Sequence, residues 1–469
     1  MLQLENVVES VLDMLRNRSM KRKIYEKLLE WKKNDHKKVS LLIDGARRVG
    51  KSWIVEEFAR REYESYVIID FNEANSTVRE FFTEYLHDLG EFYMRIEAFF
   101  GVRLIPGKSL VVFDEVQQFP PARAALKYLM KDGRFDFIET GSLISIKKNV
   151  ENIVIPSEER HIKMLPMDFE EFLWATGNEP LMELIRRCFE NRKPMGQALH
   201  RKAMDLFRQY MIVGGMPQAV NEFVQTRDLA GVDRIKRDIL ELYKGDISKH
   251  AGTMRTKVGR IFAEIPSQLQ RHEKKFQFSK LGKSGRYRDY ADTIFWLKEA
   301  MLVNICTNAT EPNIGLKLNE ENSSLKCYLG DTGLLISHAF DENELAAEDI
   351  HRRLLFDKIE LNEGMLVENI VAQMLVATGR TLHFYSSSDR QNAANRMEID
   401  FLIANTKIGR RKNISPIEVK SGKSYSLTSL SKFCAKFTSY LDSPYVLHTK
   451  DLDVKDGVTY LPLYMTPFL

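Results

Sequence analysis

The feature that most constrains the fold of this 469-residue chain is the segment GARRVGKS at residues 45–52. It fits the pattern GxxxxGKS/T, with an apolar run typical of a strand before it and a helical pattern after it. In such a loop Gly45 and Gly50 let backbone N–H groups surround phosphate oxygens, Lys51 reaches the β- and γ-phosphates, and Ser52 can bind Mg²⁺. The positive end of the following helix also faces the anion. The other loop positions assigned to this phosphate site are Arg47, Arg48 and Val49.

An acidic pair follows a second apolar run, residues 110–113, which read LVVF and end in Asp114 and Glu115. Asp114 is predicted to hold Mg²⁺, and Glu115 to orient and deprotonate the attacking water. Thr140 is either a γ-phosphate sensor or the end of a strand before a glycine turn. Arg160 is either an arginine finger, acting within the chain or toward a neighbouring subunit, or a surface arginine. Together these residues predict binding of ATP or GTP with Mg²⁺, and Glu115 predicts hydrolysis.

Short apolar runs alternate with helical segments between residues 39 and 165, which is typical of an α/β domain with a mostly parallel sheet. Residues 167–245 then show helical periodicity, with a break at 213–217 where the sequence reads VGGMP. The strands predicted in the first part are 39–43, 66–70, 110–113, 135–138 and a shorter one at 153–155, and the helices are 52–61, 78–89 and 123–130.

Residues 246–340 combine three helical patterns with two extended ones, which is the outline of a winged helix. The apolar side of the third helix is predicted to face the core, whereas Lys283, Arg286 and Arg288 at its start favour contact with DNA phosphates. The predicted helices are 256–269, 277–282 and 288–301, and the predicted strands are 302–307 and 326–329.

The last segment carries a second group of charged residues. Glu418 and Lys420 lie on one face of a predicted strand, because side chains alternate with a period of two, and Asp400 lies on the strand before it. Asp400, Glu418 and Glu368 from the preceding helix can converge on one divalent metal, with Lys420 beside the water that attacks a phosphodiester. A solvated strand edge is the alternative. The predicted elements are helices 363–378 and 427–437 and strands 382–385, 398–403, 416–419 and 445–448.

Many motifs in this order resemble a known family, the predicted AAA-type ATPases of bacteria and archaea that join a P-loop domain to a C-terminal region of unknown function. The resemblance covers nearly the whole chain. One departure is Glu159, which stands before Arg160 where the family pattern has glycine. The motifs are GARRVGKS at 45–52, FDEVQ at 113–117, TGS at 140–142, PMDFEEFL at 166–173, VGGMPQAV at 213–220, YKGDIS at 243–248, YLGDTGLL at 328–335, GMLVENIVAQML at 364–375, EIDFLI at 398–403 and PIEVKSG at 416–422.

The resemblance implies an α/β multidomain chain that joins an AAA-like ATPase core to a winged helix and a restriction-endonuclease-like domain with a PD-(D/E)xK site. It assigns nucleotide and Mg²⁺ binding to Lys51, Ser52, Asp114 and Glu115, and the nuclease-like set to Glu368, Asp400, Glu418 and Lys420. The domains expected are N-terminal helices at 1–38, a P-loop core at 39–165, a helical lid at 166–245, a winged-helix-like domain at 246–340 and a nuclease-like domain at 341–469.

Composition excludes several classes of protein. Hydrophobic residues at 44% and charged residues at 29% exclude wholesale disorder and a fibrous protein. Four cysteines without a CxxC pair indicate reduced thiols. The N-terminus lacks the pattern of a secretory signal, and no stretch approaches the roughly 18 apolar residues that span a bilayer. We therefore expect a cytoplasmic protein with no membrane partner.

The net charge of +4 is an average over basic segments and an acidic remainder. Residues 20–38, 271–288 and 407–423 carry local charges of +5, +6 and +5, which leaves −12 for the rest. The last of these segments contains a basic run that either binds phosphates or forms a solvated loop. Its residues are Lys407, Arg410, Arg411 and Lys412. We expect a nucleic-acid partner, DNA rather than RNA, and consider a homo-oligomer.

Three functions fit these patterns. The first is a nucleotide-dependent nucleic-acid enzyme in which ATP drives domain rearrangement, the winged helix docks DNA and the C-terminal domain cuts it with Mg²⁺. The second is an ATP-switched DNA-binding, scaffold or regulatory protein whose nuclease-like domain is catalytically silent. The third, a kinase, is weaker because Asp114 and Glu115 at the end of one strand favour activation of water.

Overall fold

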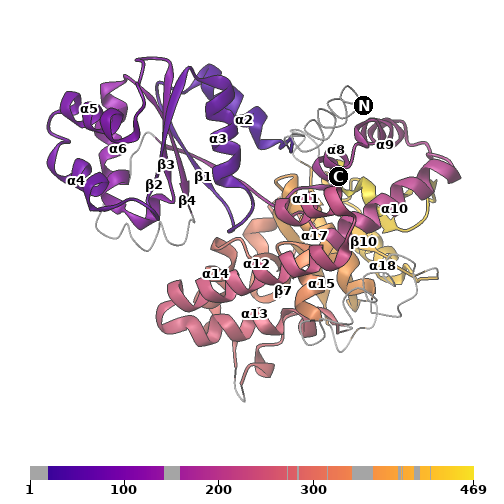
Figure 1. Ribbon diagram of the computed structural model, residues 1–469. Helices are drawn as coiled ribbons and strands as arrows, with labels where there is room; N and C mark the ends of the chain where they lie inside the picture. Colours follow the sequence, from indigo (N-terminus) through magenta and orange to yellow (C-terminus); the bar gives the residue numbers. More distant parts are fainter. Residues whose placement is uncertain are drawn as a thin grey trace.

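The computed structural model contains two β-sheets joined by helices (Figure 1). Several predictions fall outside the residues it describes: the helix before residue 20, the strand at 153–155, and Lys283, Lys407, Arg410 and Arg411. The described residues are 20–141, 159–271, 273–282, 285–313, 315–340, 363–388, 392, 395–405, 412–422 and 424–469.

The first sheet has five parallel strands in the order β2-β3-β4-β1-β5, which confirms the predicted parallel α/β sheet. Its strands are β1 Ser40–Asp44, β2 Ser65–Asp70, β3 Ser109–Asp114, β4 Asp136–Gly141 and β5 Glu159–Lys163. Its helices are α2 Ile24–Asn34, α3 Lys51–Glu62, α4 Ser76–Glu84, α5 Leu89–Phe100 and α6 Pro120–Asp132.

Alternate side chains of these strands pack on opposite faces, as strand geometry requires. Leu41 and Ile43 of β1 lie in the core with α2 and α3, whereas Leu42 packs with α4, α5 and α6. The helix predicted at 78–89 corresponds to α4, which ends earlier, at Glu84. The next helix, α5, was not predicted; it starts after Asp88, whose carboxylate accepts hydrogen bonds from the N–H groups of Gly90 and Glu91.

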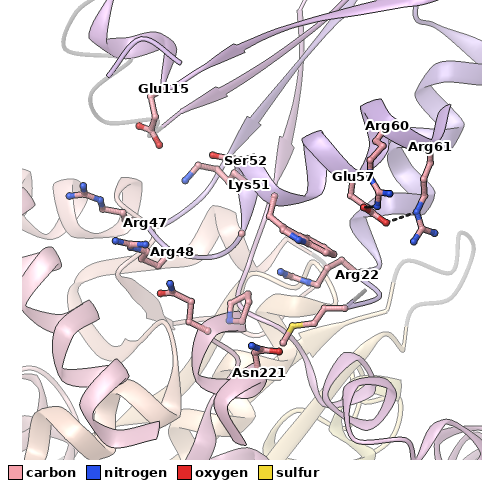
Figure 2. Close-up of a pocket in the computed structure, with 15 residues that line it drawn as sticks. Arg22, Arg47, Arg48, Lys51, Ser52, Glu57, Arg60, Arg61, Glu115 and Asn221 are labelled. Atoms are coloured by element: carbon pink, nitrogen blue, oxygen red, sulfur yellow. Dashed lines mark hydrogen bonds and ion pairs between the residues drawn. The ribbon is translucent and has the colours of Figure 1, made fainter. Parts of the chain in front are cut away.

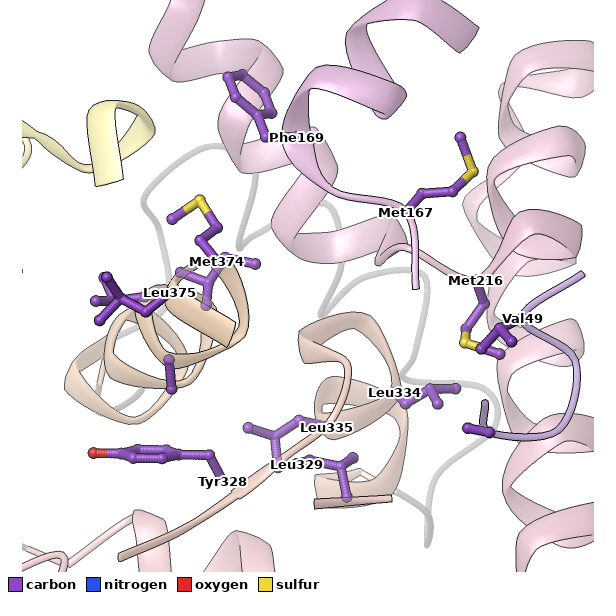
Figure 3. Packing of buried hydrophobic residues seen from close by; sticks show 14 of the residues in the cluster. Val49, Met167, Phe169, Met216, Tyr328, Leu329, Leu334, Leu335, Met374 and Leu375 are labelled. Atoms are coloured by element: carbon purple, nitrogen blue, oxygen red, sulfur yellow. The ribbon is translucent and has the colours of Figure 1, made fainter. Parts of the chain in front are cut away.

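Helices connect the two sheets, and the predicted break lies between two of them. Gly214 has a φ of 82°, and Pro217 occupies the first position of the next helix, so the chain turns sharply at this point. Figure 3 shows Met216 of this region beside Val49 of the loop after β1, and both belong to one buried cluster with Leu335 and Met374 of the C-terminal part. The helices are α8 Phe169–Ala175, α9 Glu179–Asn191, α10 Gln197–Val213, α11 Pro217–Thr226 and α12 Leu229–His250.

The second sheet is mixed and has eight strands in the order β12-β13-β11-β10-β9-β8-β6-β7. The hairpin β6–β7, predicted as part of the middle domain, belongs to this sheet because β6 pairs in parallel with β8. The sheet therefore crosses the division expected at residue 340. Its strands are β6 Val303–Ala309, β7 Glu320–Leu329, β8 Leu382–Ser387, β9 Met397–Ala404, β10 Ile414–Val419, β11 Tyr445–His448, β12 Asp453–Lys455 and β13 Val458–Pro462.

Further helices surround this sheet, and α13 and α14 lie at its β6–β7 end in Figure 1. Ile294 and Leu297 of α14 are buried, as predicted for its apolar side, and Trp296 is buried as well. Among the described helices, none is long and apolar enough to cross a membrane. The elements are α13 Arg255–Leu269, the short 3-10 helix η3 Phe278–Lys280, α14 Ala291–Glu299, α15 Thr332–Ala339, α17 Glu363–Ala377 and α18 Thr428–Lys436.

Candidate functional site

The loop between β1 and α3 has the geometry of a phosphate-binding loop. A Cβ atom added to Gly45 would lie 2.4 Å from the carbonyl oxygen of Met164, so only glycine fits. Gly50 has a φ of 95° and directly precedes α3. The buried Lys51 ammonium donates hydrogen bonds to the carbonyls of Gly45 at 3.0 Å and Ala46 at 3.1 Å. Burial lowers the pKa of Lys51 although Glu115 and Asp114 oppose this shift.

Arg22 binds the backbone of this loop at Val49, and its role was not recognised from the sequence. Its guanidinium donates to the Val49 carbonyl at 2.8 Å, to the Leu165 carbonyl at 2.7 Å and to the Glu171 carboxylate at 3.1 Å. The ion pair with Glu171 is almost fully buried. In the sequence, Arg22 was one charge among many in a basic segment. A basic residue two positions before a helical pattern was the only signal for it.

The front of the loop contacts α12. Arg47 forms an ion pair with Asp246 at 2.8 Å, and the Tyr243 hydroxyl donates to the Arg47 carbonyl at 3.1 Å. Arg48 has a φ of 69°, in the left-handed region. Tyr243 and Asp246 belong to the motif YKGDIS, which therefore lies against the phosphate loop.

The predicted acidic residues meet Thr140 at the carboxyl end of the sheet. β3 and β4 are neighbours, and the Thr140 hydroxyl donates a hydrogen bond to Asp114 while accepting one from the backbone N–H of Glu115 at 3.3 Å. Glu115 has a φ of 51°, and the Gln117 amide donates to its carboxylate. This strained backbone at Glu115 turns the residue out of the strand direction.

Lys51, Ser52 and Glu115 face one cavity of about 870 Å³ (Figure 2). Ser52 is exposed at the start of α3, and Asp114 is buried beneath. A hydroxyl and carboxylates are the oxygen donors that Mg²⁺ prefers, so this set fits the ion that a nucleotide brings. The cavity is lined by Met20, Arg22, Arg47, Arg48, Gly50, Lys51, Ser52, Trp53, Glu57, Arg60, Arg61, Glu115, Pro217, Gln218 and Asn221.

Arg160 lies apart from these residues. It is on β5 opposite Leu41, three residues before the end of β1, and its guanidinium pairs with Asp35 at 2.8 Å. The side chain does not line the phosphate cavity. An arginine finger within the chain therefore has no support from this position, and one toward a neighbouring subunit stays a prediction.

The second predicted set comes together on the mixed sheet. β9 and β10 are antiparallel with Phe401 opposite Ile417, so Asp400 and Glu418 are neighbours, and Asp400 accepts a hydrogen bond from the Val419 N–H at 2.8 Å. The Lys420 ammonium lies 2.6 Å from the Glu418 carboxylate. Burial and the nearby Asp400 raise the pKa of Glu418 to about 8.

Two lysines missed by sequence reasoning lie among these carboxylates. Lys326 of β7 is 1% exposed, and its ammonium lies 2.8 Å from Glu398, 3.7 Å from Asp400 and 3.8 Å from Glu368. The pKa of Lys326 is raised, because these carboxylates outweigh the effect of burial. Lys274 pairs with Glu368, and it also donates to the Gly364 carbonyl at 2.9 Å. The sequence signal available for Lys326 was its position as the single lysine in the apolar run LKCYL, which indicates a buried charge.

These lysines change what the carboxylates can bind. Among the described residues, no group of three or more His, Cys, Asp or Glu side chains is placed to hold a metal ion. Glu368 is held by Lys274 and by the Tyr328 hydroxyl at 3.0 Å, and one buried oxygen of Glu418 has no hydrogen-bond partner. The carboxylates of this set are thus paired with internal ammonium groups, and metal binding by Glu368, Asp400 and Glu418 stays a prediction.

Three family models match separate parts of the chain. Residues 37–173 match an AAA domain, residues 204–344 match a domain of unknown function (DUF8612), and residues 363–465 match another domain of unknown function (DUF4143). A comparison with curated proteins finds no match. The first match supports an AAA-type ATP-binding domain over the part of the chain that holds the parallel sheet and its phosphate loop.

Solved structures resemble the chain at low identity. A Walker-type ATPase of Pyrococcus abyssi is 17% identical with a TM-score of 0.40, covering 69% of this chain and 97% of that one. ORC1 of Aeropyrum pernix in complex with DNA is 13% identical with a TM-score of 0.26, covering 69% and 92%. PCH-2 of C. elegans is 14% identical with a TM-score of 0.26, covering 50% and 68%. Because these TM-scores are below 0.5, the similarities carry no argument about function.

Proposed function

We propose that this protein binds ATP with Mg²⁺, hydrolyses it, and uses the nucleotide cycle to act on or bind nucleic acid, DNA rather than RNA. The observation that carries the proposal is the convergence of Lys51, Ser52 and Glu115 on one cavity at the carboxyl end of a parallel sheet. The family match of this part to an AAA domain supports it.

Each residue then has a defined task. Lys51 neutralises charge on the β- and γ-phosphates, and Ser52 with Asp114 would hold Mg²⁺, which supplies further neutralisation when bound. Glu115 accepts the proton of the attacking water, and Gln117 orients its carboxylate. Thr140 fixes the position of Asp114 and adjoins the backbone of Glu115.

The test is ATP turnover by purified protein with and without Mg²⁺. We expect Mg²⁺-dependent hydrolysis in the wild type and its loss in Lys51→Ala. The matched control is Lys108→Ala, a lysine far from the cavity that pairs with Glu64 on the surface. Wild-type protein that neither binds nor hydrolyses ATP would overturn the proposal.

Support for nucleic-acid binding comes from the middle of the chain, where α13, η3 and α14 precede the β6–β7 hairpin in the order expected of a winged helix, although this hairpin pairs with β8 in the C-terminal sheet. Arg286 and Arg288 are exposed before α14. The exposed face of α14 itself carries Asp292, Phe295 and Lys298, which is less basic than a helix that contacts phosphates. Arg286 and Arg288 are therefore the contacts we propose.

A second candidate function is an ATP-switched scaffold or regulatory protein with a silent nuclease-like domain. Lys326 favours it, because its ammonium lies among the carboxylates where a nuclease would hold its metal. The test is Mg²⁺-dependent cleavage of plasmid and single-stranded DNA, with and without ATP. We expect no cleavage beyond that of Asp400→Ala. Cleavage by wild type that Asp400→Ala abolishes would instead establish a nuclease.

A further inference from the structure

The phosphate cavity continues past its phosphate-binding end along one face of α3. Trp53, Glu57 and Arg60 line it at spacings of four and three residues, so they project from the same side of the helix. Figure 2 shows Glu115 and Lys51 toward one end of the cavity and Glu57, Arg60 and Arg61 toward the other. A triphosphate on the loop occupies only the first end.

We infer that the remaining space is a nucleoside subsite in which the base of a nucleoside triphosphate stacks on Trp53. This inference rests on the proposed nucleotide binding. The Trp53 side chain is a large aromatic group, yet it is 42% exposed and lines the cavity next to Ser52. An exposed indole face beside a phosphate site is a stacking surface for a base, since stacking buries apolar area that water otherwise covers.

The opposite wall comes from the start of α11. A Cβ atom on Gly50 would lie 3.6 Å from Pro217, so α11 begins directly beside the phosphate loop. Gln218 and Asn221 follow on one face of α11, and both line the cavity with exposed amides. The Asn221 oxygen accepts a hydrogen bond from Gln225 at 3.3 Å, which leaves the Asn221 amino group to donate to the base. The base would then lie between the indole and these two amides.

Charges at the far end favour a nucleoside there over a second phosphate group. Arg60 and Arg61 both pair with Glu57 within α3. The Arg22 guanidinium donates hydrogen bonds to the Val49 and Leu165 carbonyls and to the Glu171 carboxylate. The cations of this end are therefore engaged within the protein, whereas the Lys51 ammonium lies against the loop carbonyls of Gly45 and Ala46, beside the phosphate position.

The test compares the affinity for MgATP with that for Mg²⁺ and inorganic triphosphate. We expect Trp53→Ala to raise the Kd of ATP about 5- to 150-fold, because base stacking on an aromatic side chain is worth about 1–3 kcal/mol. The Kd of triphosphate should not change. Trp53→Phe should retain most of the ATP affinity but lose the ATP-induced change in tryptophan fluorescence. The matched control is Tyr128→Ala, a 62% exposed aromatic outside the cavity.

Two results would overturn the subsite alone: unchanged ATP affinity in Trp53→Ala, or an equal loss for ATP and triphosphate, which would indicate a structural role for Trp53. Failure of the proposed function has a different signature. Wild-type protein would then bind neither ligand, or Lys51→Ala would bind both as tightly as wild type.

Discussion

The Lys326 ammonium lies almost without solvent contact among Glu398, Asp400 and Glu368. A buried charge is costly unless it is paired, and here each partner compensates the other. Removing the lysine would leave carboxylates facing one another in a poorly solvated space. The residue therefore holds together β7, β9 and α17.

We predict that Lys326→Met destabilises the protein by about 3–5 kcal/mol, because it leaves buried carboxylates without their cation. Adding Asp400→Asn should recover part of this loss. The measurement is urea unfolding monitored by circular dichroism. Lys298→Met on the exposed face of α14 is the control and should change stability by less than about 0.5 kcal/mol. A Lys326→Met loss as small as that of the control would contradict this account.

The phosphate-site residues were predictable because their pattern is local. Eight consecutive residues specify the loop, and Asp114 and Glu115 follow directly from the end of an apolar strand. Arg22 and Lys326 were not predictable, since Glu171 lies 149 residues from Arg22 and Glu398 is on another strand of the sheet. The spacing of residues near Arg22 or Lys326 does not predict which distant carboxylate each of them will pair with.

At the scale of elements, the turn between α10 and α11 is fixed against α15 and α17. Asp331, which caps α15, accepts hydrogen bonds from the Gly215 N–H at 2.6 Å and from Gln373 of α17 at 3.2 Å. α11 lines the nucleotide cavity, and α17 carries Glu368. Through Asp331, the turn thus joins α11, which lines the cavity, to α17, which carries Glu368.

We predict that Gly214→Ala destabilises the protein by about 2 kcal/mol or more, because its φ of 82° strains any side chain and a Cβ would lie 2.3 Å from the Asp331 carboxylate. Gly245→Ala is the matched control. Gly245 lies within α12 with nothing within 4 Å of an added Cβ, so alanine should stabilise the helix by up to about 1 kcal/mol. Thermal unfolding of both variants measures this. Equal effects of the two substitutions would exclude the tight turn.

Helices and strands with clear periodicity were predictable to within a few residues, whereas pairing between distant strands was not. The hairpin β6–β7 was found, but its place beside β8 depends on residues about 75 positions later, as in the pair Thr307–His383. β12 was missed, and β7 begins at Glu320 instead of 326, because these edge strands are polar there and carry little hydrophobic pattern. β13 was also missed; it is only five residues long.

At the scale of the whole molecule, one buried core extends from α2 through α11 and α12 to the C-terminal sheet, and a second covers the other face of the parallel sheet. The basic segments are less available to partners than their charge suggests. Lys274 and Lys420 face inward and pair with Glu368 and Glu418. Among the described residues of these segments, exposed ones such as Arg286 and Arg288 still offer surface charge to a nucleic acid.

The central claim is that Glu115 acts on water in a cavity where Lys51 binds the nucleotide. The most direct measurement determines MgATP affinity and turnover on the same preparations of wild type, Lys51→Ala and Glu115→Gln. We predict that Glu115→Gln binds ATP as wild type does but hydrolyses it at least about 100-fold more slowly, as expected for loss of a general base. Lys51→Ala should lose binding. Wild-type turnover in Glu115→Gln, or ATP binding unaffected in Lys51→Ala, would contradict the claim.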